Sequence, residues 1–161
     1  MRDGGADWKV LAVHRALDAA GLPHAIGGAR ALAFYGAERR TEDIDANVFV
    51  GIEEWPRVAA AFRPLGVAVE VDPAEIARDQ EVRLDLDGTM VHVFFSHDDL
   101  HAAMPAAVRE VPFADATIPI VASEHLVARK LMLDRPKDRA DIEAMIAADE
   151  KLRDLVRRPV D

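Results

Sequence analysis

The chain has 161 residues, of which half are apolar and 30% are charged, and its formal net charge is −9. This length and balance fit one globular domain, and the absence of cysteine excludes disulfide bonds and thiolate zinc sites. The negative charge disfavours a dedicated nucleic-acid-binding protein, because phosphate contacts require local lysine and arginine. We find no signal-peptide pattern and no apolar run long enough for a membrane span, so we expect a cytoplasmic protein without a membrane partner.

The beginning of the sequence predicts a helix, a strand and a second helix, in that order. Residues 8–20 place apolar side chains at helical spacing, and Gly21 ends that helix. Residues 24–26 follow as a short strand, and Gly27 and Gly28 come directly after it. Paired glycines before a helix let a phosphate group approach the backbone and the positive end of the helix.

A pair of aspartates follows in the apolar segment that contains Asp43, Ile44 and Asp45. Side chains alternate along a strand, so Asp43 and Asp45 face one way while Ile44 faces the core. Two carboxylates on one strand face suit Mg²⁺, which favours one or two carboxylates together with phosphate oxygens. Taken alone, the Asp-Ile-Asp motif could instead form a solvent-exposed face of a strand that binds no metal.

The rest of the chain alternates helical and extended patterns. Residues 51–63 predict a helix with acidic residues in its first turn and a proline near its start, and residues 66–71 predict a short apolar strand. Residues 118–123 predict another strand that ends in a helix N-cap at Ser123. Two helices follow, and Pro136 separates them.

A hairpin is predicted around Asp87-Gly88, the strongest two-residue turn signal in the sequence. The register pairs Asp85 with Met90 and Arg83 with His92. One face of this hairpin is apolar and is expected to lie in the core: Val82, Leu84, Leu86, Thr89, Val91, Val93 and Phe95. The opposite, polar face includes Glu81 and His92, and a functional site could lie there.

Gly27-Gly28, the following helix and Asp43-Ile44-Asp45 resemble the signature of the polymerase β-type nucleotidyltransferase superfamily, especially its minimal members. The segment from Arg39 to Asp45 is similar to the Arg-x-Thr-x-Asp-Ile-Asp motif of nucleotidyltransferase toxins of abortive-infection toxin–antitoxin systems. Residues 124–142 are similar to the last two helices of minimal nucleotidyltransferases. The resemblance implies an α/β (α+β) fold, with a small mixed β-sheet and flanking helices, as a single domain over residues 1–161.

The resemblance also implies a site that uses Mg²⁺ and a nucleoside triphosphate. Asp43 and Asp45 would hold the metal, and Lys130 would neutralise phosphate charge while Asp138 or Asp141 orients it. Alternatively, Lys130 and Asp134 could form a solvated i, i+4 ion pair. The residues expected to border the nucleotide are Gly27, Gly28, Arg30, Arg39, Thr41, Lys130 and Asp138.

His92 stands where the resemblance predicts a third catalytic carboxylate. An imidazole can act as a general base near neutral pH, but it is a poorer ligand for Mg²⁺ than an oxygen atom. Asp85 could substitute for the missing carboxylate; alternatively, His92 only pairs with Asp85 or the backbone and the chain is weakened or inactive. His97 and His101 are spaced i, i+4 without a third ligand, and we interpret them as surface residues.

Three functions are consistent with this sequence. The first is a toxin that transfers a nucleotidyl group to an RNA or protein acceptor and is silenced by an antitoxin protein. The second is a small-molecule enzyme, such as an antibiotic nucleotidyltransferase. The third is a degenerate nucleotide-binding or partner-binding module without turnover.

Overall fold

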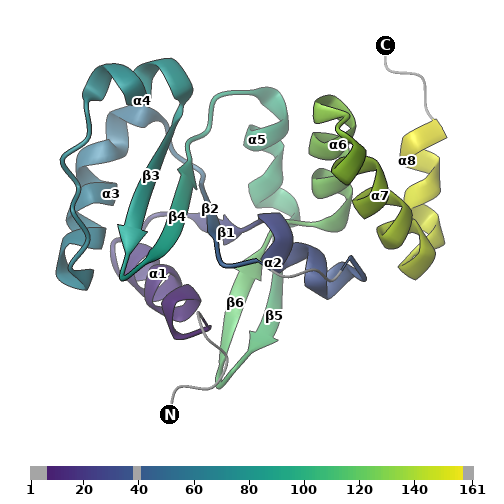
Figure 1. Ribbon diagram of the computed structural model, residues 1–161, viewed down its shortest axis with the longest axis horizontal. Coiled ribbons are helices and arrows are strands. Elements are labelled where there is room, and N and C mark those ends of the chain that lie inside the picture. Colours follow the sequence, from purple (N-terminus) through teal and green to yellow (C-terminus); the bar gives the residue numbers. More distant parts are fainter. Residues whose placement is uncertain (1–6, 38–40, 158–161) are drawn as a thin grey trace.

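The computed structural model describes residues 7–37 and 41–157, which form one six-stranded mixed sheet flanked by helices (Figure 1). The strand order is β3-β4-β2-β1-β6-β5, so β3 and β5 are the outer strands. The strands are β1 (His24–Ile26), β2 (Ile44–Val48), β3 (Glu81–Leu86), β4 (Thr89–Phe94), β5 (Arg109–Phe113) and β6 (Ala116–Ile120). The α-helices of the described residues are α1 (Asp7–Ala19), α2 (Gly28–Leu32), α3 (Trp55–Phe62), α4 (Pro73–Asp79), α5 (Asp99–Ala103), α6 (Ser123–Leu133), α7 (Pro136–Ala148) and α8 (Arg153–Arg157).

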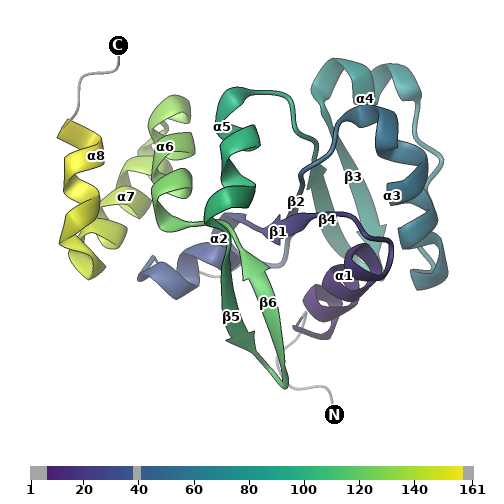
Figure 2. The same ribbon diagram turned by 180° about the vertical axis from the view of Figure 1, so that it is seen from behind.

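The predicted fold class is confirmed by this mixed sheet. Strand β2 pairs in parallel with β4 and antiparallel with β1, and β1 pairs in parallel with β6. Helices α6, α7 and α8 lie together at one end of the molecule, and α3 and α4 lie at the other (Figures 1 and 2). Within the described residues, no helix combines the length and the apolar character that crossing a membrane requires.

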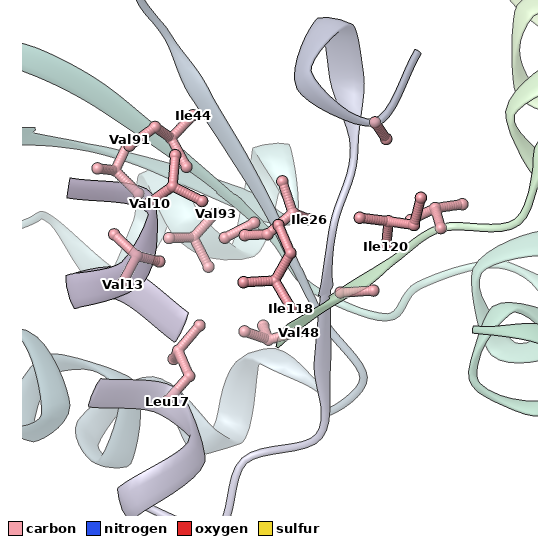
Figure 3. Close-up of a cluster of buried hydrophobic side chains, with 14 of the residues drawn as sticks. Val10, Val13, Leu17, Ile26, Ile44, Val48, Val91, Val93, Ile118 and Ile120 are labelled. Carbon is pink, nitrogen blue, oxygen red and sulfur yellow. The ribbon is translucent and has the colours of Figure 1, made fainter. Parts of the chain in front are cut away.

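Helix α1 covers one face of the sheet with a row of apolar side chains. Val10, Val13 and Leu17 are fully buried and face strand residues such as Val91 and Val93 (Figure 3). Their spacing of three and four residues keeps them on one side of the helix, which explains why this segment forms an amphipathic helix. The polar residues of β2 and β4 therefore project from the opposite face.

The hairpin β3–β4 has the predicted register and the predicted buried face. Asp87 and Gly88 form the turn with positive φ angles of 49° and 86°. Positive angles at both central residues match the right-handed twist of the two strands, which is why the Asp-Gly sequence identifies this turn.

The strand predicted at residues 66–71 is wrong, because these residues are not part of the sheet. Val67 and Val69 are buried without pairing to another strand, so their alternation reflects packing alone. Helix α4 follows and was not predicted from the sequence. The Asp72 side chain accepts a hydrogen bond from the Ala74 amide, and Pro73 occupies the first helical position, a combination that marks a helix start.

Helices α6 and α7 differ slightly from the predicted boundaries. Ala122 is the N-cap of α6, and Ser123 is its first residue instead of its cap. The helix ends at Leu133 because Asp134 adopts a left-handed conformation with φ of 48°. Pro136 then begins α7, a position where its missing N–H is not needed.

Candidate active site

The glycine pair connects β1 to α2 and lies against strand β2. The Gly27 amide donates a hydrogen bond to the Asp45 carbonyl over 2.9 Å. A Cβ atom on Gly28 would overlap the Asp45 carboxylate, and Gly28 has a positive φ of 59°. A Cβ atom on Gly27 would lie 2.6 Å from the side-chain nitrogen of Asn47. Gly28 therefore requires glycine, and a Cβ atom at Gly27 would have to displace the Asn47 amide, because the backbone turn passes directly over the polar face of β2.

Asp45 lies within β2 and is partly buried, whereas Asp43 immediately precedes the strand and is exposed. Burial raises the pKa of Asp45, and the negative charges of Asp43 and Glu81 raise it further, while His92 and Lys130 lower it. No side chain among the described residues donates a hydrogen bond to the Asp45 carboxylate. A partly buried carboxylate without a donor is suited to binding a cation.

Arg30 holds the chain that leads into β2. Its Nε donates to the Asp43 carbonyl over 2.9 Å, and its Nη2 lies 3.5 Å from the Thr41 carbonyl. The Thr41 hydroxyl accepts a hydrogen bond from the Asp43 amide over 3.2 Å. Arg30 and Thr41 thus hold the backbone around Asp43 in place. Their predicted contacts with a nucleotide stay predictions. Arg39, also predicted to contact the nucleotide, lies outside the described residues.

His92 lies beside Asp45 in the register of β2 and β4. Its Nε2 is 3.1 Å from the Glu81 carboxylate, and its ring is 4.0 Å from the Phe94 ring, centre to centre. The contact with Glu81 has the distance of an ion pair but not the direction of a hydrogen bond. Glu81 is paired with Phe94, so it approaches His92 diagonally across the hairpin.

Asp85 is not the partner of His92. Its carboxylate accepts a hydrogen bond from the Gly88 amide over 2.7 Å, which closes the hairpin turn. The interpretation that His92 pairs with Asp85 is therefore wrong, and Glu81 takes that place. The alternation of the hairpin predicts the correct face for Glu81, but it does not reveal which residues are diagonal neighbours in the register.

Lys130 is buried between two aspartates of α7. Its Nζ is 3.2 Å from the Asp138 carboxylate and 2.8 Å from that of Asp141. Arg135 also binds Asp138, with its Nε 2.6 Å away, and this contact is the largest cause of the lowered pKa of Asp138. The alternative pair of Lys130 with Asp134 is wrong, because Asp134 binds Arg139. Nucleotide contacts of Lys130 and Asp138 stay predictions.

A buried polar network supports the glycine turn from α5. His101 is buried, and its Nε2 is 3.1 Å from the Asn47 side-chain oxygen, so the interpretation of His101 as a surface residue is wrong. Burial, followed by the charges of Arg129 and His97, lowers the pKa of His101 to about 4. His101 is therefore neutral at pH 7. The i, i+4 spacing with His97 could not reveal this role, because Asn47 is distant in the sequence.

These features together define the nucleotidyltransferase fold that the resemblance implied, and comparison with solved structures confirms the fold. No family model and no curated protein matches the sequence. The structure matches the antibiotic-resistance factor ANT(2'')-Ia with a TM-score of 0.65 and 18% identity, over 97% of this chain and 93% of that chain. A second structure of ANT(2'')-Ia, in complex with adenylyl-2''-tobramycin, gives the same score and identity.

Two further solved structures share this fold. The lincosamide antibiotic adenylyltransferase LnuA, with lincomycin bound, matches with a TM-score of 0.56 and 12% identity, over 86% of this chain and 94% of that one. An antigenic nucleotidyltransferase-like protein from Paracoccidioides brasiliensis matches with a TM-score of 0.59 and 15% identity, over 91% of this chain and 78% of that chain. At these identities the likeness establishes the shared fold.

Proposed function

We propose that this protein transfers a nucleotidyl group from a nucleoside triphosphate to a hydroxyl group of a small molecule. The main support is the close contact between the Gly27-Gly28 turn and Asp45, which places the start of α2 beside a carboxylate that accepts no hydrogen bond from a described side chain. The nucleotidyltransferase fold of the chain supports the same reaction class.

Asp43 and Asp45 would hold Mg²⁺, and their chemistry fits this ion. Carboxylate oxygens are hard ligands, and because burial raises the pKa of Asp45, a bound cation would stabilise its ionised form. When bound, Mg²⁺ would neutralise charge on the phosphate oxygens. The backbone of Gly27 and Gly28 would orient the triphosphate.

His92 would accept the proton of the attacking hydroxyl group. The acceptor oxygen would form a bond to the α-phosphorus while the bond to pyrophosphate breaks, and the released proton would move to the imidazole. The position of His92 beside Asp45 supports this role, because a base must lie close to the reacting phosphate.

A small acceptor is favoured by the comparisons and by charge. The antibiotic-resistance factor ANT(2'')-Ia and the lincosamide antibiotic adenylyltransferase LnuA match this chain over nearly their whole lengths. The formal charge of −9 disfavours a large RNA acceptor. Toxin action on RNA or protein, with an antitoxin partner, stays a prediction from the resemblance.

A nucleotide-binding module without turnover is the second candidate. The specific observation in its favour is His92, which replaces the expected third carboxylate and contacts Glu81. In that case the site would bind a triphosphate and Mg²⁺ but release no pyrophosphate.

One experiment separates these functions. The protein is incubated with each nucleoside triphosphate, radiolabelled at the α-phosphate, plus Mg²⁺ and either an aminoglycoside, a lincosamide, total RNA or cell protein. We expect label on a small molecule and none with Asp43→Asn or Asp45→Asn. Label on RNA or protein would support the toxin, and nucleotide binding without label transfer to any acceptor would support the module.

A further inference from the structure

The side chain of Asn47 lies beside the glycine turn, on the same face of β2 as Asp45. Residues two apart in a strand face the same side of the sheet, so the Asn47 amide and the Asp45 carboxylate share the polar face. Asn47 is paired with Ala25 of β1. A Cβ atom on Gly27 would lie 2.6 Å from the Asn47 nitrogen, Nδ2, so the glycine leaves room for this amide.

Two neighbours fix the direction of the Asn47 amide. The Ala25 carbonyl can only accept a hydrogen bond, and it faces Nδ2 at 3.5 Å. The amide oxygen, Oδ1, is therefore turned toward α5, where it lies 3.1 Å from Nε2 of His101. An amide oxygen only accepts, so Nε2 of His101 carries the proton. The amide is thus held with its oxygen toward His101 and its nitrogen toward the glycine turn.

His101 is itself held by residues of several elements. Its backbone amide donates to the Asp98 carboxylate over 2.7 Å, and the same carboxylate accepts a hydrogen bond from Arg129 of α6 over 2.8 Å. The His101 ring is buried and lies 5.3 Å from the Phe49 ring, centre to centre. A buried ring with these contacts cannot turn freely, so it is a rigid support for the Asn47 amide.

The Asn47 nitrogen has a donor capacity that the protein does not use. An amide nitrogen carries two hydrogens. Within residues 7–37 and 41–157, Nδ2 makes only the contact with the Ala25 carbonyl, which is longer than an ordinary hydrogen bond. Asn47 is partly buried, and a donor that is partly removed from water binds a charged acceptor more strongly than a neutral one.

We propose that Asn47 contacts the nucleoside triphosphate, with Nδ2 donating a hydrogen bond to a phosphate oxygen held at the Gly27-Gly28 turn. His101 is then a positioning residue, because it sets the direction of this donor without touching the substrate. This inference rests on the proposed nucleotidyl transfer. A donor that is oriented before the substrate binds needs no rearrangement when the phosphate arrives, which is the advantage of fixing the amide from behind.

The contact can be observed directly, because the sequence contains one asparagine and one glutamine, Asn47 and Gln80. A ¹⁵N-labelled sample therefore has only two carboxamide NH₂ groups. The protein is titrated with Mg²⁺ and the α,β-methylene analogues of ATP, CTP, GTP and UTP, which cannot release pyrophosphate. We expect one Asn47 side-chain proton to move downfield on binding. The Gln80 amide, bonded to the Ala77 carbonyl, should not move, and the nucleosides without phosphate should shift neither group.

Substitutions separate the contact from the positioning. Asn47→Leu removes the donor at similar size and should weaken binding of the analogue by about tenfold or more, as loss of a hydrogen bond to a charged group predicts. His101→Leu leaves the amide free to turn and should weaken binding less. His101→Gln can still donate and should bind nearly as the wild type does. Gln80→Met removes the other carboxamide and is the matched control. Calorimetry measures the Kd, and melting curves verify that each variant folds.

Failure of this inference is distinguishable from failure of the proposed function. The contact is overturned if an analogue binds the wild type without moving the Asn47 proton, if the nucleoside alone moves it, or if folded Asn47→Leu binds as the wild type does. None of these results affects the proposed reaction. Equal binding by His101→Leu and His101→Gln would overturn the positioning role. If no analogue binds the wild type, the proposed function and this inference are overturned together.

Discussion

Asp45 is a carboxylate whose ionised form is unfavourable in the folded chain, because burial raises its pKa above the ordinary 3.8. When a carboxyl group has a higher pKa in the folded chain than in the unfolded chain, its ionisation at higher pH destabilises the fold. This destabilisation disappears at a pH low enough to protonate the group in both the folded and the unfolded chain. A cation bound at this carboxylate, as we propose, would offset the unfavourable charge.

Asp45→Asn should therefore abolish nucleotidyl transfer yet raise the Tm at pH 7. Each kcal/mol gained moves the Tm of a chain of this length by about 2–4 °C. The gain should shrink as the pH is lowered toward 4, since Asp45 then becomes protonated. Thermal unfolding from pH 4 to 8 measures this, and Asp43→Asn, at an exposed position, should lose activity without a Tm gain. A lower Tm for Asp45→Asn at pH 7 would contradict our account.

Gly28→Ala tests the contact between the turn and Asp45. The added methyl group would overlap the carboxylate and would also strain a backbone with φ of 59°. Gly66→Ala is a matched control, because Gly66 has φ of 80° but no atom within 4 Å of the added Cβ. Both variants should lose about 1–2 kcal/mol of stability from the left-handed conformation, and only Gly28→Ala should lose activity. Equal activity of the two variants would argue against a phosphate site at this turn.

His92→Ala should slow transfer by about 10²–10⁴-fold if the imidazole takes the proton. His92→Asp should keep or increase activity, because it supplies the expected oxygen ligand for Mg²⁺. Met90→Ala, two residues away on the same strand face, is the control and should behave as the wild type. Steady-state rates with saturating triphosphate decide the matter. Unchanged activity in His92→Ala would make this histidine a bystander.

At the scale of single elements, Lys130 joins α6 to α7 through a buried ion cluster. Lys130→Met should destabilise the protein, since Asp138 and Asp141 would lose their shared cation, and breaking buried pairs of this kind costs about 3–5 kcal/mol. Arg135 remains as a partner of Asp138 and should reduce the loss. Arg139→Ala breaks only the exposed pair with Asp134 and should change stability by under about 1 kcal/mol. Urea unfolding compares the variants, and equal midpoints would contradict a structural role for Lys130.

The two hairpins show which elements the sequence can predict. The β3–β4 turn is a local Asp-Gly signal, so its register follows from two residues. The β5–β6 turn contains Ala114 with φ of 53°, where neither glycine nor asparagine marks the bend. The sequence alone therefore does not indicate a hairpin in this segment. The bend is specified by the pairing of the two strands, which a local pattern does not reveal.

The candidate site was predictable only where its residues share one strand or one turn. Gly27, Gly28 and Asp45 follow from spacing and resemblance. The Glu81 contact with His92 depends on the register of two strands, and the His101 contact with Asn47 joins elements that are 54 residues apart. Such contacts require the assembled sheet.

At the scale of the whole molecule, stability should decrease in acid because of His101. Its pKa is about 4 in the folded chain and 6.5 ordinarily, so the unfolded chain binds more protons between these values. The Tm should therefore fall as the pH drops from 6.5 to 4, and His101→Gln should reduce this slope. His97→Gln removes one of the two charges that help to lower the pKa of His101, so it should reduce the slope less than His101→Gln does. Equal slopes for all three proteins would mean that His101 is not held neutral by the fold.

The two outer strands of the sheet bear on how the protein behaves when crowded. Every open sheet edge offers unpaired backbone groups to a strand from another molecule. Here β3 carries Glu81, Arg83 and Asp85, and β5 carries charged residues and Pro112, which has no amide hydrogen to donate. Charge at both edges, together with proline in β5, disfavours the addition of further strands. The sheet is thus protected against open-ended, fibril-like growth at its edges, although its central strands contain the polar residues of the candidate site.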